Sequence, residues 1–195
     1  MNPLQDSLEA LTGLRPTLEA VEKLRTFADW LVAEAVPNGG LGPNEAKNVV
    51  DRHILGSAAF SIGFPQPPES GWDLGSGVGI PGMVLAVLWP QTRMRLVDRS
   101  QRRCDLARRA ARILGVVVDV EVADISELDV RAEAIVSRAT IPAVRFVPIL
   151  ERLLVPGGVA VVSGSDAVPG PPFLAITIPQ GVLDTPPKLL MMRSP

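Results

Sequence analysis

The sequence predicts an α/β fold, in which a mainly parallel, seven-stranded sheet carries helices on both faces and follows an N-terminal helical cap. Two observations lead to this prediction. After about residue 67, short apolar runs that suit buried strands alternate with segments of helical periodicity. Before that point, apolar residues recur only at helical spacing. We expect one domain over residues 1–195, with the cap in 1–66 and the sheet in 67–195.

The cap is predicted to consist of helices. Residues up to Leu14 are compatible with a short helix. Apolar residues at helical spacing predict a longer helix over 16–36, which the run Pro37–Gly40 ends. A further helix is expected from Asn44 to about Phe60, and a proline-rich connector over 63–68 then leads into the first strand.

Seven apolar runs are the predicted strands. The first ends near Leu74, and the others cover 94–98, 116–122, 134–137, 159–162, 173–178 and 188–192. Helices are expected over 83–88, 101–114 and 144–154 between them. The last two strands are the weakest in pattern, and we expect them to close the sheet as an antiparallel pair.

A glycine-rich turn over residues 72–82 is the most informative stretch. Its glycines give the spacing G-x-G-x-G and are Gly75, Gly77 and Gly79. The dinucleotide fingerprint G-x-G-x-x-G would need a third glycine where Ile80 stands. Glycines reach positive φ easily and let backbone N–H groups approach a ligand. The helix beyond the turn, with Pro81 near its first turn, would add unpaired donors. A tight turn without any ligand is the alternative.

An acidic residue follows at the end of the next strand. Asp98 closes the run 94–98, about 20 residues after the turn, where a carboxylate accepts hydrogen bonds from ribose hydroxyls. Asp124 and Arg138 also fall at expected carboxyl ends of strands, where ligands of parallel sheets bind. The sequence therefore predicts a site for an adenosine-containing ligand at this edge.

Composition limits the other possibilities. The formal net charge of −2 gives no overall basic field, so a nucleic-acid surface would have to be local. The single cysteine, Cys104, excludes an internal disulfide and fits a reducing cytosol. With one cysteine and one histidine, His53, no metal site is expected. No signal peptide or membrane-spanning run is apparent, so we expect a cytoplasmic protein without a membrane partner.

The chain resembles the GidB/RsmG family, the bacterial small-subunit ribosomal RNA (guanine-N7) methyltransferases. The similarity covers roughly residues 16–165. The stretches that carry it are 73–82, Asp98 with Arg102-Arg103, Ser137-Arg138-Ala139, and Arg52-His53-Ile54-Leu55 with Ser57.

The resemblance implies a Rossmann-like class I methyltransferase fold, S-adenosylmethionine (SAM) as cofactor, and small-subunit ribosomal RNA or the ribosomal subunit as partner. Asp98 would hold the ribose hydroxyls, and residues 124–126 would bracket the adenine. The implied cofactor-binding residues are Gly75, Ser76, Gly77, Gly79, Ile80, Pro81, Asp98, Asp124, Ile125, Ser126 and Arg138.

Guanine N7 carries an in-plane lone pair and can attack a methyl sulfonium without first losing a proton. Catalysis then needs alignment and electrostatics rather than a general base. Arg138 is the candidate catalytic residue, because a guanidinium can donate to guanine O6 or steer the SAM carboxylate. A structural salt bridge is the alternative role for Arg138.

Other functions remain open at this point. The acidic balance suits a SAM-dependent methyltransferase of a small molecule or another RNA, and a non-catalytic SAM-binding homologue is a third hypothesis. The arginines of the helix over 101–114 could contact RNA or form a solvated face. His53, on an apolar helix face, is expected to be a hydrogen-bonded core residue.

Overall fold

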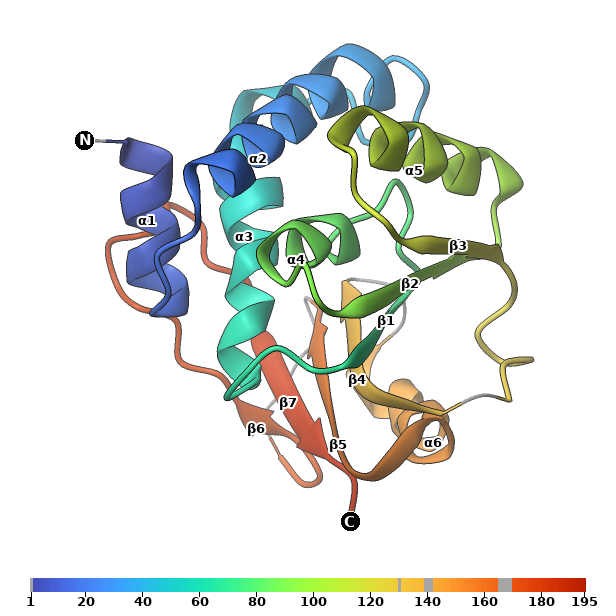
Figure 1. Ribbon diagram of the computed structural model, residues 1–195. Helices are drawn as coiled ribbons and strands as arrows, with labels where there is room; N and C mark the ends of the chain where they lie inside the picture. Colours follow the sequence, from blue (N-terminus) through green and yellow to red (C-terminus); the bar gives the residue numbers. More distant parts are fainter. Residues whose placement is uncertain (1, 130, 139–141, 165–169) are drawn as a thin grey trace.

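A computed structural model describes residues 2–129, 131–138, 142–164 and 170–195. Its centre is a seven-stranded sheet of order β3-β2-β1-β4-β5-β7-β6 (Figure 1). The strands are β1 (Ser70–Leu74), β2 (Arg93–Asp98), β3 (Asp119–Val122), β4 (Ala132–Arg138), β5 (Leu154–Ser163), β6 (Leu174–Ala175) and β7 (Leu189–Arg193). Strands β1 to β5 pair in parallel, and β7 runs antiparallel to both β5 and β6. The predicted fold class and the closing antiparallel pair are confirmed.

Helices cover both faces of the sheet. The cap contains α1 (Pro3–Thr12), α2 (Leu18–Trp30), η1 (Leu31–Ala35), η2 (Glu45–Asn48), η3 (Val49–Leu55), α3 (Gly56–Ala58) and η4 (Ala59–Gly63). The helices within the sheet region are α4 (Gly82–Leu88), α5 (Gln101–Leu114) and α6 (Ala143–Leu153). Helices α2, α3, α4 and α5 lie on one side of the sheet, and α6 lies on the other (Figure 1).

The side chains on the two faces of the sheet pack into two separate apolar clusters. Leu96, Val136 and Val161 pack with the cap, α4 and α5 in one cluster. Val97 and Ile135, one position along, pack with α6 in the other. This alternation follows from the pleat of a strand, which points successive side chains to opposite faces.

The second cap helix differs from its prediction. Instead of one α-helix from Asn44 to Phe60, the chain passes through a 3₁₀ turn, the π-helical η3, a short α turn and a second 3₁₀ turn. Within this stretch the Ser57 hydroxyl donates to the carbonyl of His53, four residues back. Such side-chain back-bonds compete with the main-chain ladder and bend helices.

The predicted strand over 116–122 is also shorter than expected. Only Asp119–Val122 joins the sheet, as β3 at its edge. The N–H of Val116 instead donates to Ala111 in the cap of α5, after Gly115 has turned the chain at a φ of +61°. The β-branched side chains of 116–118 were therefore a misleading strand signal. The predicted strand over 173–178 likewise shortens to Leu174–Ala175.

None of the described helices is long and apolar enough to cross a membrane.

Candidate cofactor and substrate site

The glycine-rich turn follows β1 and adopts the backbone that the sequence predicts. Gly75, Gly77 and Gly79 have φ values of +76°, +58° and +102°. A Cβ built at Gly77 meets no heavy atom within 4 Å, so its backbone faces open space. A ligand can therefore approach the main chain of Gly77 closely.

Asp73 ties this turn to the helix that follows it. Its side chain is fully buried, and Oδ2 accepts a hydrogen bond from the N–H of Gly82 at 2.6 Å. Pro81 stands just before α4, and the N–H of Met83 donates to Gly79 at 2.8 Å. The donors of Gly82 and Met83 are therefore engaged within the protein. The sequence predicts unpaired N–H donors at the start of this helix, and for Gly82 and Met83 that prediction is wrong.

Two buried side-chain oxygens lie beside the turn. Asp73 Oδ1 and Ser76 Oγ have no hydrogen-bond partner within the part of the chain that the structure describes. Burial, with a smaller contribution from Asp98, raises the pKa of Asp73 to about 7, although the Gly82 N–H and Arg138 both oppose this rise. Buried polar atoms without partners are rare in folded proteins. A ligand that brings hydrogen-bond donors would satisfy both oxygens.

Asp98 lies at the end of β2 and faces the same turn. Its carboxylate accepts from the N–H of Gly77 at 3.0 Å and from the N–H of Ser100 at 2.8 Å. Arg103 Nη1 lies 3.8 Å from Oδ2. Each carboxylate oxygen has a further lone pair, so both can still accept from ribose hydroxyls. The two residues that the sequence singled out, Gly77 and Asp98, thus meet in one place.

The segment 124–126 forms a turn beyond β3. Asp124 Oδ1 accepts from the N–H and the hydroxyl of Ser126 at 2.9 and 2.7 Å, and these bonds lower the pKa of Asp124. Arg152 of α6 donates to the carbonyls of Ile125 and Ser126 at 3.2 and 3.0 Å. Asp124 and Ser126 are exposed, and Ile125 is half-buried. The N–H of Ala123, just before the turn, donates to the carbonyl of Asp98 at 3.2 Å, so the turn lies at the carboxyl end of β2.

Arg138 ends β4 on the other side of β1, and its charged neighbours come from the cap and from β1. Burial lowers the pKa of Arg138, Arg52 lowers it further, and Glu45 and Asp73 oppose the change. Glu45 binds two cap residues, with His53 Nε2 at 2.8 Å and Arg52 Nη1 at 3.1 Å. Ala139, the third residue of the Ser-Arg-Ala motif, lies outside the described residues.

Sequence reasoning missed Glu45 and Asp73. Asp73 could have been found, because it directly precedes the glycine turn. Glu45 gave no usable signal, since its position depends on the irregular helices between 45 and 63. His53 is buried and hydrogen-bonded, as expected.

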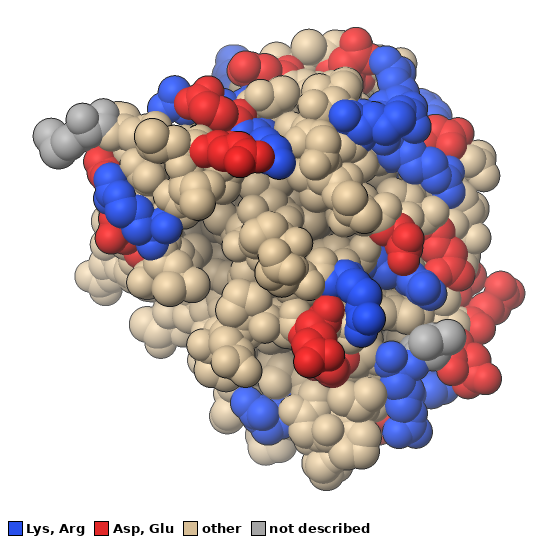
Figure 2. Space-filling view, viewed as in Figure 1, with Lys and Arg blue, Asp and Glu red and all other residues tan. Residues whose placement is uncertain are grey.

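The arginine-rich helix α5 is partly tied to the rest of the protein. Arg108 donates to the carbonyl of Val120 at 2.7 Å, and Arg109 pairs with Glu34 of the cap at 2.8 Å. A group of basic side chains over this region is visible at the upper right of Figure 2, with acidic side chains beside it. The exposed basic group is compatible with RNA contact. The interactions of Arg108 and Arg109 within the protein favour a structural role for these two residues.

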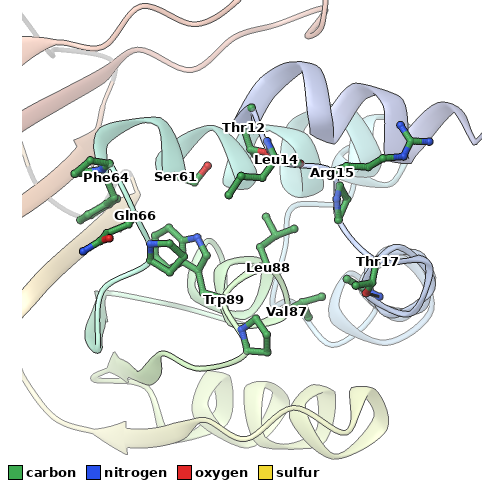
Figure 3. Close-up of a pocket in the computed structure, with 16 residues that line it drawn as sticks. Thr12, Leu14, Arg15, Thr17, Ser61, Phe64, Gln66, Val87, Leu88 and Trp89 are labelled. Carbon is green, nitrogen blue, oxygen red and sulfur yellow. Dashed lines mark hydrogen bonds between the residues drawn. The ribbon is translucent and has the colours of Figure 1, made fainter.

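A cavity of about 470 Å³ lies elsewhere, near the amino ends of β1 and β2. Its walls include Leu14, Phe64, Leu88 and Trp89 (Figure 3). Ligands of parallel sheets bind at the carboxyl ends of the strands. This cavity is therefore not the site predicted from the glycine turn.

No group of three or more His, Cys, Asp or Glu side chains suited to a metal ion occurs among residues 2–129, 131–138, 142–164 and 170–195.

Comparison with known proteins adds independent information. The family model described as "GidB: rRNA small subunit methyltransferase G" matches residues 20–166. Ribosomal RNA small subunit methyltransferase G of Mycobacterium marinum is 35% identical over 142 residues, which are 70% of this chain and 60% of that protein. The protein of the same name from Acidothermus cellulolyticus is 33% identical over 159 residues, 81% of this chain and 69% of that one.

The chain thus spans about half to two-thirds of the length of the curated relatives that it matches. Among solved structures, an RNA methyltransferase from Salinibacter ruber in complex with S-adenosyl-L-homocysteine superposes with a TM-score of 0.51 at 21% identity. That match covers 65% of this chain and 81% of the other. At this identity the likeness shows a shared fold, that of class I SAM-dependent methyltransferases.

Proposed function

We propose, since this chain belongs to the GidB family of small-subunit rRNA methyltransferases, that it transfers the methyl group of SAM to N7 of a guanine in small-subunit ribosomal RNA. The observation that carries the proposal is the family match over residues 20–166, which contains every proposed site residue. Its substrate would place the protein in the cytoplasm, on ribosomal RNA or on the subunit itself.

The site residues divide between the two ends of the cofactor. In this proposal, Asp98 binds the ribose hydroxyls, and the turn 124–126 borders the adenine. The backbone of 75–81 passes beneath the cofactor, and Ile80 and Pro81 form the last part of this segment. Asp73 and Ser76 would receive donors from the methionine moiety, because each has a buried oxygen that no described residue hydrogen-bonds.

When bound, SAM supplies an electrophilic methyl group on a positively charged sulfur. The protein has to orient the acceptor in line with that group and exclude water. Neutral guanine needs no general base, because its N7 lone pair is already available. Arg138, at the end of β4, can donate to guanine O6 and so hold N7 toward the methyl group.

The experiment uses small ribosomal subunits from a strain that lacks this methylation. They are incubated with the purified chain and SAM labelled in the methyl group, and the RNA is digested to nucleosides for mass spectrometry. We expect label in 7-methylguanosine. Label in another nucleoside would overturn the N7 assignment, and SAM binding without transfer would favour the non-catalytic homologue.

Two variants control this assay. Asp98→Asn should lose transfer at low SAM concentration, because ribose binding weakens. Asp105→Asn changes an exposed carboxylate of α5, which pairs with Arg108, and should behave as the wild type.

A further inference from the structure

We propose that Glu45 recognises the guanine base, by accepting hydrogen bonds from its N1–H and N2-amino groups, and that His53 positions the Glu45 carboxylate for this contact. The inference rests on the proposed function, because it names the side chain that selects guanine at the same site. Nothing in the family match assigns this role to residue 45.

Glu45 lies on the side of the site where the acceptor base must enter. Asp98 ends β2 and Asp124 lies in the turn after β3, so in the proposed function the adenosine half of the cofactor extends in that direction. The methyl group and its acceptor then lie toward β4, on the opposite side of β1. The cap segment that carries Glu45 comes close here, since the charges of Glu45 and Arg52 both act on Arg138 at the end of β4.

The Glu45 carboxylate is fixed by two hydrogen bonds and can still accept others. Its side chain is 22% exposed and binds His53 through Oε2 and Arg52 through Oε1. Each oxygen keeps a lone pair for another donor. A fixed, partly exposed carboxylate is suited to bind a planar group that carries two adjacent donors.

His53 holds the Glu45 carboxylate as a neutral imidazole. Burial, together with the charges of Arg138 and Arg52, lowers the pKa of His53 to about 4, although Glu45 opposes the change. At pH 7 the ring therefore carries one proton, and the hydrogen bond to the carboxylate places it on Nε2. Its Nδ1 is buried without a hydrogen-bond partner in the described part of the chain. His53 thus acts on the substrate only through Glu45, as a positioning residue.

The chemistry distinguishes guanine from the other purine. Guanine presents N1–H and the N2 amino group side by side, and a carboxylate can accept from both. Adenine has an unprotonated N1 at the same position, which would face the carboxylate as a second acceptor. A site built for hydrogen-bond donors discriminates strongly against a ligand that lacks them, because its own groups are left unpaired. Guanine O6 remains available to Arg138.

The test measures nucleotide binding directly, without methyl transfer. The protein is saturated with S-adenosylhomocysteine, and dissociation constants for GMP, IMP and AMP are measured by saturation-transfer NMR. For the wild type we expect GMP to bind at least about tenfold more tightly than AMP, with IMP between them because it lacks the N2 amino group.

Glu45→Gln should reduce the GMP-to-AMP ratio to nearly one, with S-adenosylhomocysteine affinity unchanged as proof of folding. The matched control is Glu34→Gln, which removes an exposed carboxylate that pairs with Arg109, and it should keep the wild-type ratio. His53→Gln retains a side-chain donor and should keep more of the ratio than His53→Phe. A wild type without preference, or a preference that survives Glu45→Gln, would overturn the inference.

Failure of the proposed function has a different signature. In that case no label would reach 7-methylguanosine in the subunit assay, whatever the nucleotide ratio measured in the binding experiment.

Discussion

Two buried carboxylates flank the glycine turn and have different electrostatic surroundings. Asp98 has both oxygens occupied by backbone N–H donors, whereas Asp73 has one occupied oxygen and one without a partner in the described residues. Burial raises the pKa of Asp73, and a cation beside its Oδ1 would favour the charged form again. Asp73 is therefore suited to an ammonium group, and Asp98 to neutral hydroxyls.

Replacing Asp98 tests the ribose contact. Asp98→Asn keeps one acceptor oxygen but loses the charge that strengthens its hydrogen bonds. We expect the Kd for SAM to rise about tenfold, which corresponds to about 1.4 kcal/mol. Isothermal titration calorimetry measures this change, with Asp105→Asn as the surface control. An unchanged Kd in Asp98→Asn would contradict the contact between Asp98 and the ribose.

Gly77 and Gly181 form a matched pair for the glycine turn. Their φ values are +58° and +77°, and a Cβ at either position meets nothing within 4 Å. Alanine should therefore destabilise the fold by about 1 kcal/mol in each case, through the left-handed backbone alone. Only Gly77→Ala should also weaken SAM binding, because only its methyl group would occupy the ligand's approach. Equal SAM affinities in the two variants would place the ligand elsewhere.

Asp73 should make stability depend on pH. Its pKa is about 7 in the folded protein and near 3.8 when unfolded. Between these values the unfolded chain has lost the proton and the folded one retains it, so stability falls as the pH rises from about 4 to 7. The shift corresponds to at most about 4 kcal/mol.

Urea unfolding at pH 5 and pH 8 measures the effect. Asp73→Asn should lose less stability between the two pH values than the wild type does. The surface variant Asp105→Asn should lose as much as the wild type. A wild type and an Asp73→Asn variant with identical pH dependence would contradict the assignment.

At the scale of elements, the contact between β1 and α4 keeps the turn in shape. Gly82 begins α4 next to Asp73, and a Cβ there would lie 2.2 Å from Leu96 Cδ2 and 2.8 Å from Asp73 Cβ. A side chain at residue 82 would therefore force Leu96 or Asp73 to shift.

Gly82→Ala should therefore destabilise the protein by about 1–3 kcal/mol through overpacking, and it should also lower SAM affinity by displacing the turn. Gly56→Ala is the comparison, since its Cβ would meet only the carbonyl of Asp51 at 3.5 Å within a helical segment. That variant should be neutral or slightly stabilised. Chemical denaturation compares the two, and a well-tolerated alanine at 82 would contradict the packing argument.

Much of the secondary structure could be predicted because it follows local rules. Strands β1, β2, β4 and β5 are buried on both faces and appear as short apolar runs between turns. The run over 116–118 misled because its first N–H caps α5, which a pattern of β-branched residues does not reveal. The segment 45–63 misled because helical periodicity does not distinguish α from π and 3₁₀ turns.

At the scale of the whole molecule, the topology explains why the candidate site could be predicted only in part. Asp98 and Arg138 end their strands and Gly77 lies just after one, and parallel strands that are neighbours bring their ends together. Sequence order is therefore enough to predict their proximity. Glu45 reaches the same edge through the cap, a contact between distant segments that no local pattern encodes.

The family membership and the local geometry support the same account. The family match extends from the cap to just beyond β5, so both the glycine turn and the cap residues around His53 fall within it. The cavity near Trp89 lies at the other end of the strands and has no part in the proposed reaction.

A crystal structure with S-adenosylhomocysteine is the most direct test of where the cofactor binds. The account predicts the ribose hydroxyls within hydrogen-bond distance of Asp98, the amino group beside Asp73, and the sulfur facing Arg138 and Glu45. Density for the ligand in the cavity lined by Leu14 and Trp89, with Asp98 still bound only to its own backbone neighbours, would contradict it.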